Sequence, residues 1–173
     1  MRHFTLLVLL GLFIGTQAVN LTDLLEALNT TEKTWLKKRT YNIWNHTCVY
    51  TIKRVLNATY YEFEQGYKTD HTTVTHTLYA RLGQNESAYP WMKVSNMSEV
   101  TRGLMYFLHY WNTSEKCGIL KVHLLGQYQY EMHQWNSTVE EEKSSCTNKY
   151  NELVCGNHSY EIYSNSCRSG NTN

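Results

Sequence analysis

The sequence predicts a mainly β protein: an eight-stranded antiparallel barrel, preceded by a short helix and followed by a helix packed on its outside. Segments rich in Tyr, Val, Ile, Thr and Trp follow one another along residues 34–135, with Gly, Asn and Ser between them. Helical periodicity flanks this region on both sides. The chain also has 14 Tyr and 5 Trp, residues that favour strands and line cavities. A β-sandwich is the main alternative.

Each expected strand is a short run bounded by turn residues. The eight runs are 34–44, 47–56, 59–68, 71–82, 88–96, 104–111, 117–125 and 127–135. A further short strand is expected within residues 160–167.

The N-terminus has the features of a secretory signal. A basic residue precedes an apolar run at residues 4–15, which is too short to span a bilayer comfortably. Small residues follow at Thr16 and Ala18, as signal cleavage prefers. We therefore expect a signal peptide at 1–18 and one secreted, extracellular domain at 19–173. A membrane anchor or a buried first helix is the alternative.

Glycosylation acceptor triplets are unusually frequent. Nine Asn-x-Ser/Thr triplets without a central proline occur in the chain. They begin at Asn20, Asn29, Asn45, Asn57, Asn85, Asn96, Asn112, Asn136 and Asn157. This number indicates a glycoprotein.

Charge and motifs exclude several classes of function. The chain has 16 basic and 15 acidic residues and no basic cluster, which argues against nucleic acid or an anionic membrane as partner. It lacks the G-x-S-x-G, phosphate-loop, H-E-x-x-H and C-x-x-C motifs. We therefore expect no enzyme activity and no cofactor. His123 and His133 could meet across a hairpin, but no third ligand is evident, so we expect no metal site.

The opening helix is predicted by an apolar stripe. Leu21, Leu24, Leu25 and Leu28 have helical spacing. An acidic residue, Asp23, stands early, where the helix dipole favours it.

The closing helix is expected over residues 137–156. Ser137 and Glu140 have the spacing of a capping box, and Gly156 suits the end of the helix. One stripe holds Val139, Cys146, Tyr150 and Leu153 and should face the barrel.

The chain has five cysteines, so an intramolecular pairing leaves one over. Cys155 lies nine residues after Cys146, which on a helix is about 180° around the axis. If Cys146 faces the barrel, Cys155 faces away from it. Spacing alone leaves the pairing of the others open.

Three stretches resemble the secreted histamine-binding lipocalins of tick saliva: "TWLKKRTYNIWNHTC", "KCGILKVHLLGQYQYEMHQW" and "CTNKYNELVCG" with "YSNSC". The resemblance covers nearly the whole mature chain and implies a lipocalin-type barrel. It also implies disulfides Cys48–Cys167 and Cys117–Cys146, with Cys155 free. The lipocalin G-x-W signature is reduced to Trp35, because no glycine precedes it.

The resemblance also implies a set of ligand-binding residues. They are Tyr41, Trp44, Leu104, Tyr106, Glu131 and His133. The family's amine binders carry two acids in the corresponding stretches; Glu131 keeps one, but Gly118 stands where an aspartate would. Tyr106 also replaces an acid, so the pocket should be more aromatic and less anionic than that of a histamine binder. The alternative is that Tyr41 and Trp44 simply pack in the core and do not contact a ligand.

The pattern of residues 127–135 conflicts with this assignment. Gln129, Glu131 and His133 alternate with Tyr128, Tyr130 and Met132. Periodicity alone would place the tyrosines inside and Glu131 in water, whereas the resemblance places Glu131 inside.

The function that follows is a secreted, non-catalytic salivary scavenger of a small host mediator of inflammation. A biogenic amine, histamine or serotonin, is the favoured ligand. The alternatives are a lipid mediator such as a leukotriene, fatty acid or sterol, or a glycosylated immunomodulator that binds a host protein. We expect a monomer, with an intermolecular disulfide through Cys155 as the alternative.

Overall fold

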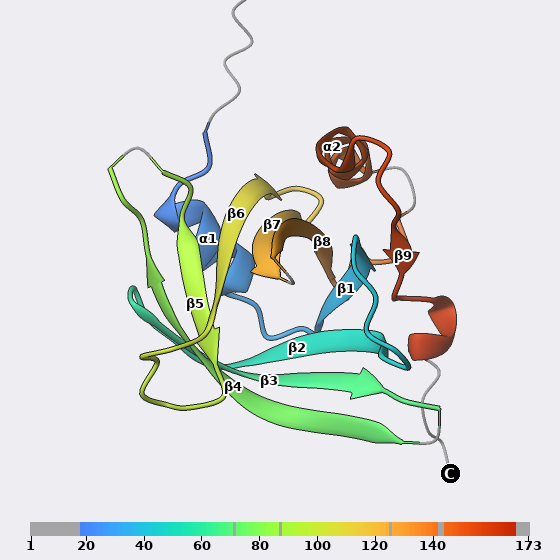
Figure 1. Ribbon diagram of the computed structural model, residues 1–173, viewed down its shortest axis with the longest axis horizontal. Helices are drawn as coiled ribbons and strands as arrows, with labels where there is room; N and C mark the ends of the chain where they lie inside the picture. The colour runs from blue at the N-terminus through green and yellow to red at the C-terminus, as the bar shows by residue number, and fades with distance from the viewer. Residues whose placement is uncertain (1–17, 71, 87, 125, 142–143, 169–173) are drawn as a thin grey trace, which may run out of the picture.

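A computed structural model describes residues 18–168 except 71, 87, 125 and 142–143, so most of the expected signal peptide lies outside the described residues. Eight antiparallel strands neighbour one another in chain order, and β1 pairs with both β2 and β8, which closes the barrel (Figure 1). The expected eight-stranded barrel is confirmed. The strands are β1 (Thr34–Arg39), β2 (Thr47–Leu56), β3 (Tyr60–Lys68), β4 (Thr73–Gly83), β5 (Trp91–Ser95), β6 (Leu104–Asn112), β7 (Cys117–Leu124) and β8 (Gln127–Trp135).

The first strand is shorter than expected, because it ends at Arg39 and residues 40–46 form a loop. Arg39 itself holds this loop, since its Nη2 donates to the carbonyls of Ile43 and His46. Asn45 then turns the chain with a φ of 59°, a left-handed conformation that asparagine tolerates. The prediction of a strand through residue 44 is therefore wrong.

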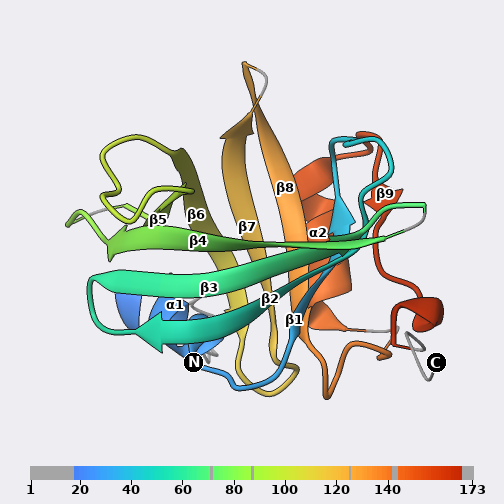
Figure 2. The same ribbon diagram turned by 90° about the horizontal axis from the view of Figure 1, so that it is seen from below.

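A short helix, α1 (Leu21–Leu28), closes one end of the barrel, opposite the β7–β8 hairpin (Figure 2). Asn20 caps it by accepting from the backbone of Thr22 and Asp23, and Asp23 accepts from the backbone of Asn20. Leu24 is 1% exposed and belongs to the main apolar core inside the barrel. The expected amphipathic helix is confirmed, and its apolar stripe seals the barrel floor.

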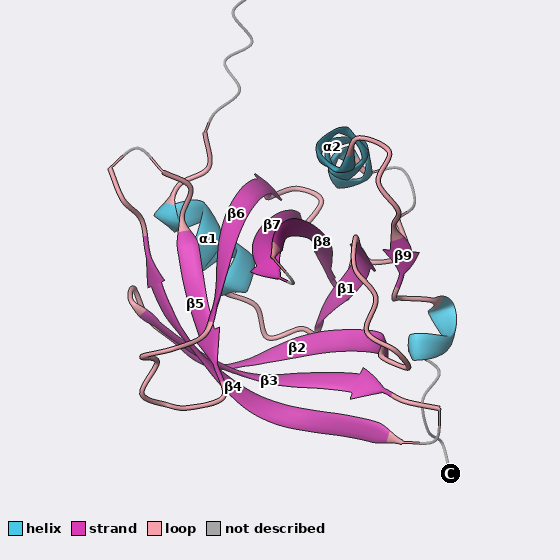
Figure 3. Cartoon of the chain, viewed as in Figure 1, coloured by secondary structure: helices cyan, strands magenta, loops and turns pink. Residues whose placement is uncertain are grey.

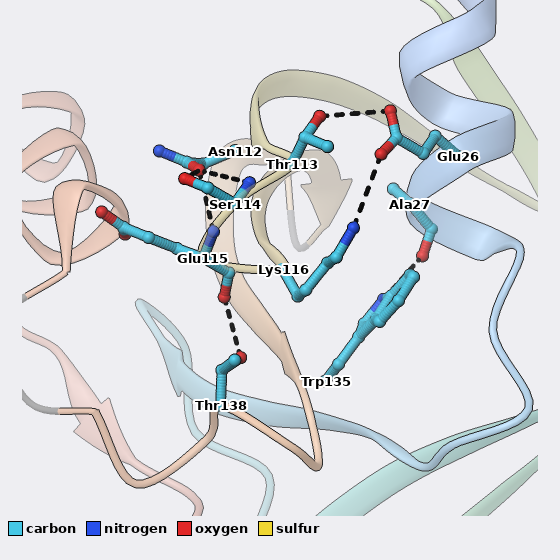
Figure 4. A network of polar contacts seen from close by, with 9 residues as sticks. All are labelled: Glu26, Ala27, Asn112, Thr113, Ser114, Glu115, Lys116, Trp135 and Thr138. Carbon is cyan, nitrogen blue, oxygen red and sulfur yellow. Dashed lines mark hydrogen bonds and ion pairs between the residues drawn. The ribbon is translucent and has the colours of Figure 1, made fainter.

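Polar contacts attach α1 to the turn between β6 and β7 (Figure 4). Glu26 accepts from Thr113 Oγ1 at 3.2 Å and lies 3.8 Å from Lys116 Nζ. The indole Nε1 of Trp135 donates to the carbonyl of Ala27 at 3.1 Å. The second half of the helix is thereby tied to the barrel wall.

The second helix, α2 (Ser145–Val154), begins eight residues later than expected. Its cap is Ser144, whose Oγ accepts from the backbone of Thr147. Ser137, the expected cap, instead donates through N and Oγ to the carboxylate of Glu32, so the predicted capping box is wrong. Figure 3 shows both helices lying against a structure made mainly of strands. Neither has the length and apolar composition needed to cross a bilayer, as far as the described residues show.

Helix α2 packs on the outer face of β7 and β8. Cys146, Tyr150 and Val154 are buried in one cluster with Ile119 and Met132. The Cys117–Cys146 disulfide joins the helix to β7 covalently. This contact gives β8 an apolar environment on its outer side.

A second disulfide, Cys48–Cys167, joins β2 to the C-terminal 3₁₀ turn Asn165–Cys167, which follows β9 (Tyr160–Glu161). The two bridges span 119 and 29 residues along the chain, separations for which the entropic model gives about 3 to 5 kcal/mol each. Cys155 is exposed and unpaired at the end of α2, as the helical wheel indicates.

The free thiol gives a first prediction. Iodoacetamide should alkylate Cys155 in the native protein without reduction, while Cys48, Cys117, Cys146 and Cys167 should react only after reduction. Peptide mapping by mass spectrometry measures both. Detection of Cys155 in an intramolecular disulfide would contradict the assignment.

The barrel floor gives a second prediction. Leu24→Ala should lower the free energy of unfolding by about 2 to 5 kcal/mol, because it leaves a cavity in the core. Val55→Ala, at a residue 47% exposed, should change it by less than about 0.5 kcal/mol. Urea denaturation measures both changes, and equal effects would show that α1 does not contribute to the core.

Candidate ligand-binding site

Described residues of the barrel interior line three adjoining chambers. The outer chamber, about 200 Å³ in volume, lies at the end formed by the β1–β2 and β7–β8 loops. A side chamber of about 260 Å³ extends toward β5, and an inner chamber of about 70 Å³ lies against α1. Thr51 and His133 line all three, so the chambers meet at these two residues. Each volume is below the roughly 300 to 1,000 Å³ of pockets for drug-sized ligands, so a single chamber suits only a very small molecule.

The acid implied by the resemblance lies inside the barrel. Glu131 is 5% exposed and lines the outer and side chambers. The hydroxyl of Tyr41 donates to Oε1 of Glu131. The Nε2 of His133 lies 2.7 Å from Oε2. Each carboxylate oxygen therefore already has one protein partner.

The pKa of Glu131 is lowered despite its burial. Burial alone raises the pKa, but the hydrogen bond and charge of His133, the hydrogen bond from Tyr41 and the positive charge of Arg39 outweigh it. Burial, together with the charge of this carboxylate, raises the pKa of Tyr41 and Tyr106 well above the usual value. The site at neutral pH thus holds an ionised carboxylate among neutral phenols.

Arg39 is a site residue that sequence reasoning missed. It is 2% exposed, lines the outer chamber and lies opposite Glu131 in the β1–β8 register. A β-bulge between Leu36 and Lys38 brings it to the inner face. Sequence alternation cannot reveal a bulge, although the rarity of a buried arginine makes the residue informative once the fold is known.

Five of the six expected ligand residues line the outer chamber. They are Tyr41, Leu104, Tyr106, Glu131 and His133. Trp44 does not, since its residue is 84% exposed. Trp44 lies in the loop that follows the end of β1 at Arg39, not in the strand itself.

The burial pattern of β8 shows which face of the strand points into the barrel, a point on which periodicity and the resemblance disagree. Gln129 and Glu131 are buried inside the barrel, while Met132 is buried beneath α2 and Tyr128 is 59% exposed. The inward placement implied by the resemblance is therefore correct, and the placement implied by periodicity is wrong. Periodicity fails because α2 covers the outer face of the strand.

The inner chamber is apolar. Its lining includes Leu24, Phe63, Leu108 and Leu120, together with Gly118. A Cβ added at Gly118 would lie 3.1 Å from a backbone oxygen and 3.2 Å from an indole carbon. The position where the family's binders carry an aspartate therefore leaves little room here for any side chain.

The histidines considered as metal ligands do not converge. His123 is exposed and contacts the ring of Tyr128, whereas His133 faces the chambers. Among the described residues, Glu115, Cys117 and Cys146 could gather around an ion. Both sulfurs, however, are committed to the disulfide.

A closed antiparallel barrel with one end sealed by a helix and an internal polar site defines a lipocalin-type barrel. The chain matches the tick histamine binding protein family over residues 16–169 and belongs to that family. A comparison with curated proteins found no match.

Two solved structures share the fold. One is described as the AM182 serotonin complex: it has a TM-score of 0.65 and 13% identity, with 83% of this chain and 91% of that chain covered. The other is japanin from Rhipicephalus appendiculatus bound to cholesterol: it has a TM-score of 0.59 and 14% identity, with 82% and 98% covered. At these identities the likeness concerns the fold alone.

The lowered pKa of Glu131 gives a third prediction. Below the ordinary value of 4.5, the unfolded chain binds a proton that the folded protein does not, so stability falls as pH falls through the folded pKa. In Glu131→Gln this dependence should be lost, and the melting temperature should fall less between pH 6 and pH 3. Glu99→Gln, at an exposed loop residue, should melt like the wild type. If the melting temperature falls equally with pH in all three proteins, the prediction is contradicted.

Proposed function

We propose that the protein is a secreted, non-catalytic carrier that sequesters a small host mediator of inflammation inside its barrel. The favoured ligand is a biogenic amine, histamine or serotonin, with its ammonium beside Glu131. The observation that carries the proposal is the ionised carboxylate buried in a chamber walled by tyrosines. The resemblance between this fold and that of a protein described as a serotonin complex supports it.

The chemistry of the chamber suits an ammonium group. A buried cation requires an opposite charge, which Glu131 supplies. Tyr41, Tyr67 and Tyr106 line the same chamber, and aromatic faces attract cations. Tyr41 and Tyr106 also remain neutral, because their pKa values are raised.

A lipid mediator is a second candidate, favoured by the inner chamber. That chamber is bordered mainly by apolar side chains, and Trp111, which lines it, has a buried Nε1 with no partner among the described residues. A largely hydrocarbon molecule with one oxygen acceptor would match both features. The fold of japanin, a cholesterol-bound protein, is similar. Mass spectrometry of molecules that co-purify with the secreted protein distinguishes an amine from a fatty acid or sterol.

Secretion and glycosylation belong to the same proposal. The expected signal peptide would direct the chain outside the cell, where the two disulfides are stable. Asn112 is a poor glycan acceptor among the nine sequons, because its Nδ2 donates to Ser145 Oγ and its Oδ1 accepts from the backbone of Ser114 and Glu115. Figure 4 shows Asn112, Ser114 and Glu115 in the turn between β6 and β7.

The role of Glu131 gives a fourth prediction. Glu131→Gln should weaken histamine or serotonin binding roughly 10- to 100-fold, because it removes a charge-assisted interaction of about 1.5 to 3 kcal/mol. Glu99→Gln is the matched control and should bind like the wild type. Isothermal titration calorimetry with each amine and with a leukotriene measures the changes.

The same titrations can exclude an amine as the ligand. Undetectable binding of both amines by the wild type would exclude that ligand class. Leukotriene binding that is unchanged or stronger in Glu131→Gln would favour the lipid, because the substitution removes a charge that repels a carboxylate.

A further inference from the structure

The bulge in β1 determines which basic side chain enters the barrel. Leu36 lies opposite His133, the register then shifts, and Arg39 lies opposite Glu131. With uninterrupted alternation, Lys38 would share the inner face with Leu36, and Arg39 would point outward. Instead Lys38 forms an ion pair with an acid of β9 outside the barrel. The bulge thus exchanges a lysine for an arginine at the cavity wall.

The guanidinium of Arg39 is incompletely satisfied by the protein. Its Nη2 donates to the carbonyls of Ile43 and His46 at 3.3 and 3.4 Å, which is longer than most such bonds. The guanidinium carbon Cζ of Arg39 lies 5.0 Å from the ring centroid of Tyr41. Its Nε is buried without a partner among the described residues. A polar residue that is 2% exposed and lines a cavity should have such a donor matched by a ligand.

Arg39 and Glu131 are adjacent on neighbouring strands but do not form an ion pair with each other within the described part of the chain. The contacts of Glu131 are instead the hydroxyl of Tyr41 and the Nε2 of His133. The outer chamber therefore presents a positive and a negative group side by side, each with capacity for a further partner.

We propose that Arg39 is a second ligand-binding group, which binds a carboxylate, and that the Arg39–Glu131 pair is complementary to a molecule that carries an ammonium and a carboxylate together. The inference rests on the proposed function, because it assumes that the barrel binds a small ligand. It adds ligands that carry a carboxylate to the amines proposed above. Arginine stays charged when buried, and its planar donors fit a carboxylate.

Charge balance supports the pairing. A simple amine beside Glu131 leaves Arg39 unmatched and gives the buried site a net positive charge, which is unfavourable in a poorly hydrated cavity. An aminocarboxylate adds no net charge and supplies a partner to both residues. Opposite residues of an antiparallel pair place their Cβ atoms about 5 Å apart, so charges close together on one small molecule match the pair.

Three ligands with the same indole ring test the inference. Tryptamine carries only the ammonium, indole-3-propionate only the carboxylate, and tryptophan both. Wild-type protein should bind tryptophan most tightly in calorimetric titrations at pH 7.4. Arg39→Gln should weaken the binding of tryptophan and of indole-3-propionate roughly 10- to 100-fold. It should leave the binding of tryptamine unchanged or stronger.

Two further variants complete the design. Arg39→Lys keeps the charge but not the planar donors, so it should recover part of the carboxylate affinity. Arg54→Gln removes an arginine that is paired with Glu64 and has a side chain 54% exposed, and it should bind all three ligands like the wild type. Retained tryptamine binding by Arg39→Gln, with a native circular dichroism spectrum, shows that the variant is folded.

The outcomes separate this inference from the proposed function. Binding of tryptamine alone by the wild type would overturn the role of Arg39 and leave the amine proposal standing. Binding of the two carboxylates, lost in Arg39→Gln, would support Arg39 even if tryptamine does not bind. Equal carboxylate affinities in the wild type and Arg39→Gln would overturn the inference, and no binding of any of the three would count against both proposals.

Discussion

The pairing of β1 with β8 is the constraint on which both the barrel and its site depend. β1 has only six residues, yet it pairs with β2 at Thr34 and Trp35, with β8 along its length, and with β9 at Lys38 and Arg39. These ladders leave β1 without a free edge, so the sheet closes instead of exposing unpaired backbone groups. They also fix which side chains of the first and last strands of the barrel lie side by side inside it.

The outer cover of β8 is the second constraint. Because α2 is joined to β7 by a disulfide and packs over Met132, the outer face of this part of β8 is covered, while the other face lies inside the barrel. The inward face can therefore carry Gln129 and Glu131 only because partners inside the barrel satisfy them: Thr40 contacts Gln129, and Tyr41 contacts Glu131. These hydrogen bonds stabilise the polar stripe within the barrel.

Much of the fold could be predicted from the sequence, since each strand is a short run rich in β-branched and aromatic residues and α1 has a clear apolar stripe. The late start of α2 could not, because Ser137 satisfies its hydrogen bonds with Glu32, a residue far away in the sequence. The disulfide pairing came from the resemblance, because spacing alone left it open.

The site was predictable only in part, for similar reasons. Glu131 was recognised by its place in a family motif, against its local periodicity, because the helix that covers β8 is a tertiary feature. Arg39 was missed because one extra residue in β1 inverts the alternation. Trp44 was assigned to the cavity by the resemblance, whereas β1 ends at Arg39 and Trp44 is exposed in the loop that follows.

The residues that would contact a ligand also hold the loop at residues 40–46. Tyr41 belongs to this loop and donates to Glu131, while Arg39 donates to the carbonyls of Ile43 and His46. His46 in turn stacks on Tyr67 of β3 with ring centroids 3.8 Å apart. A ligand that displaces Arg39 Nη2 from these carbonyls, or that replaces Tyr41 at Glu131, would therefore alter the contacts that position the loop. Occupancy of the outer chamber and the conformation of its rim are thus governed by the same few hydrogen bonds.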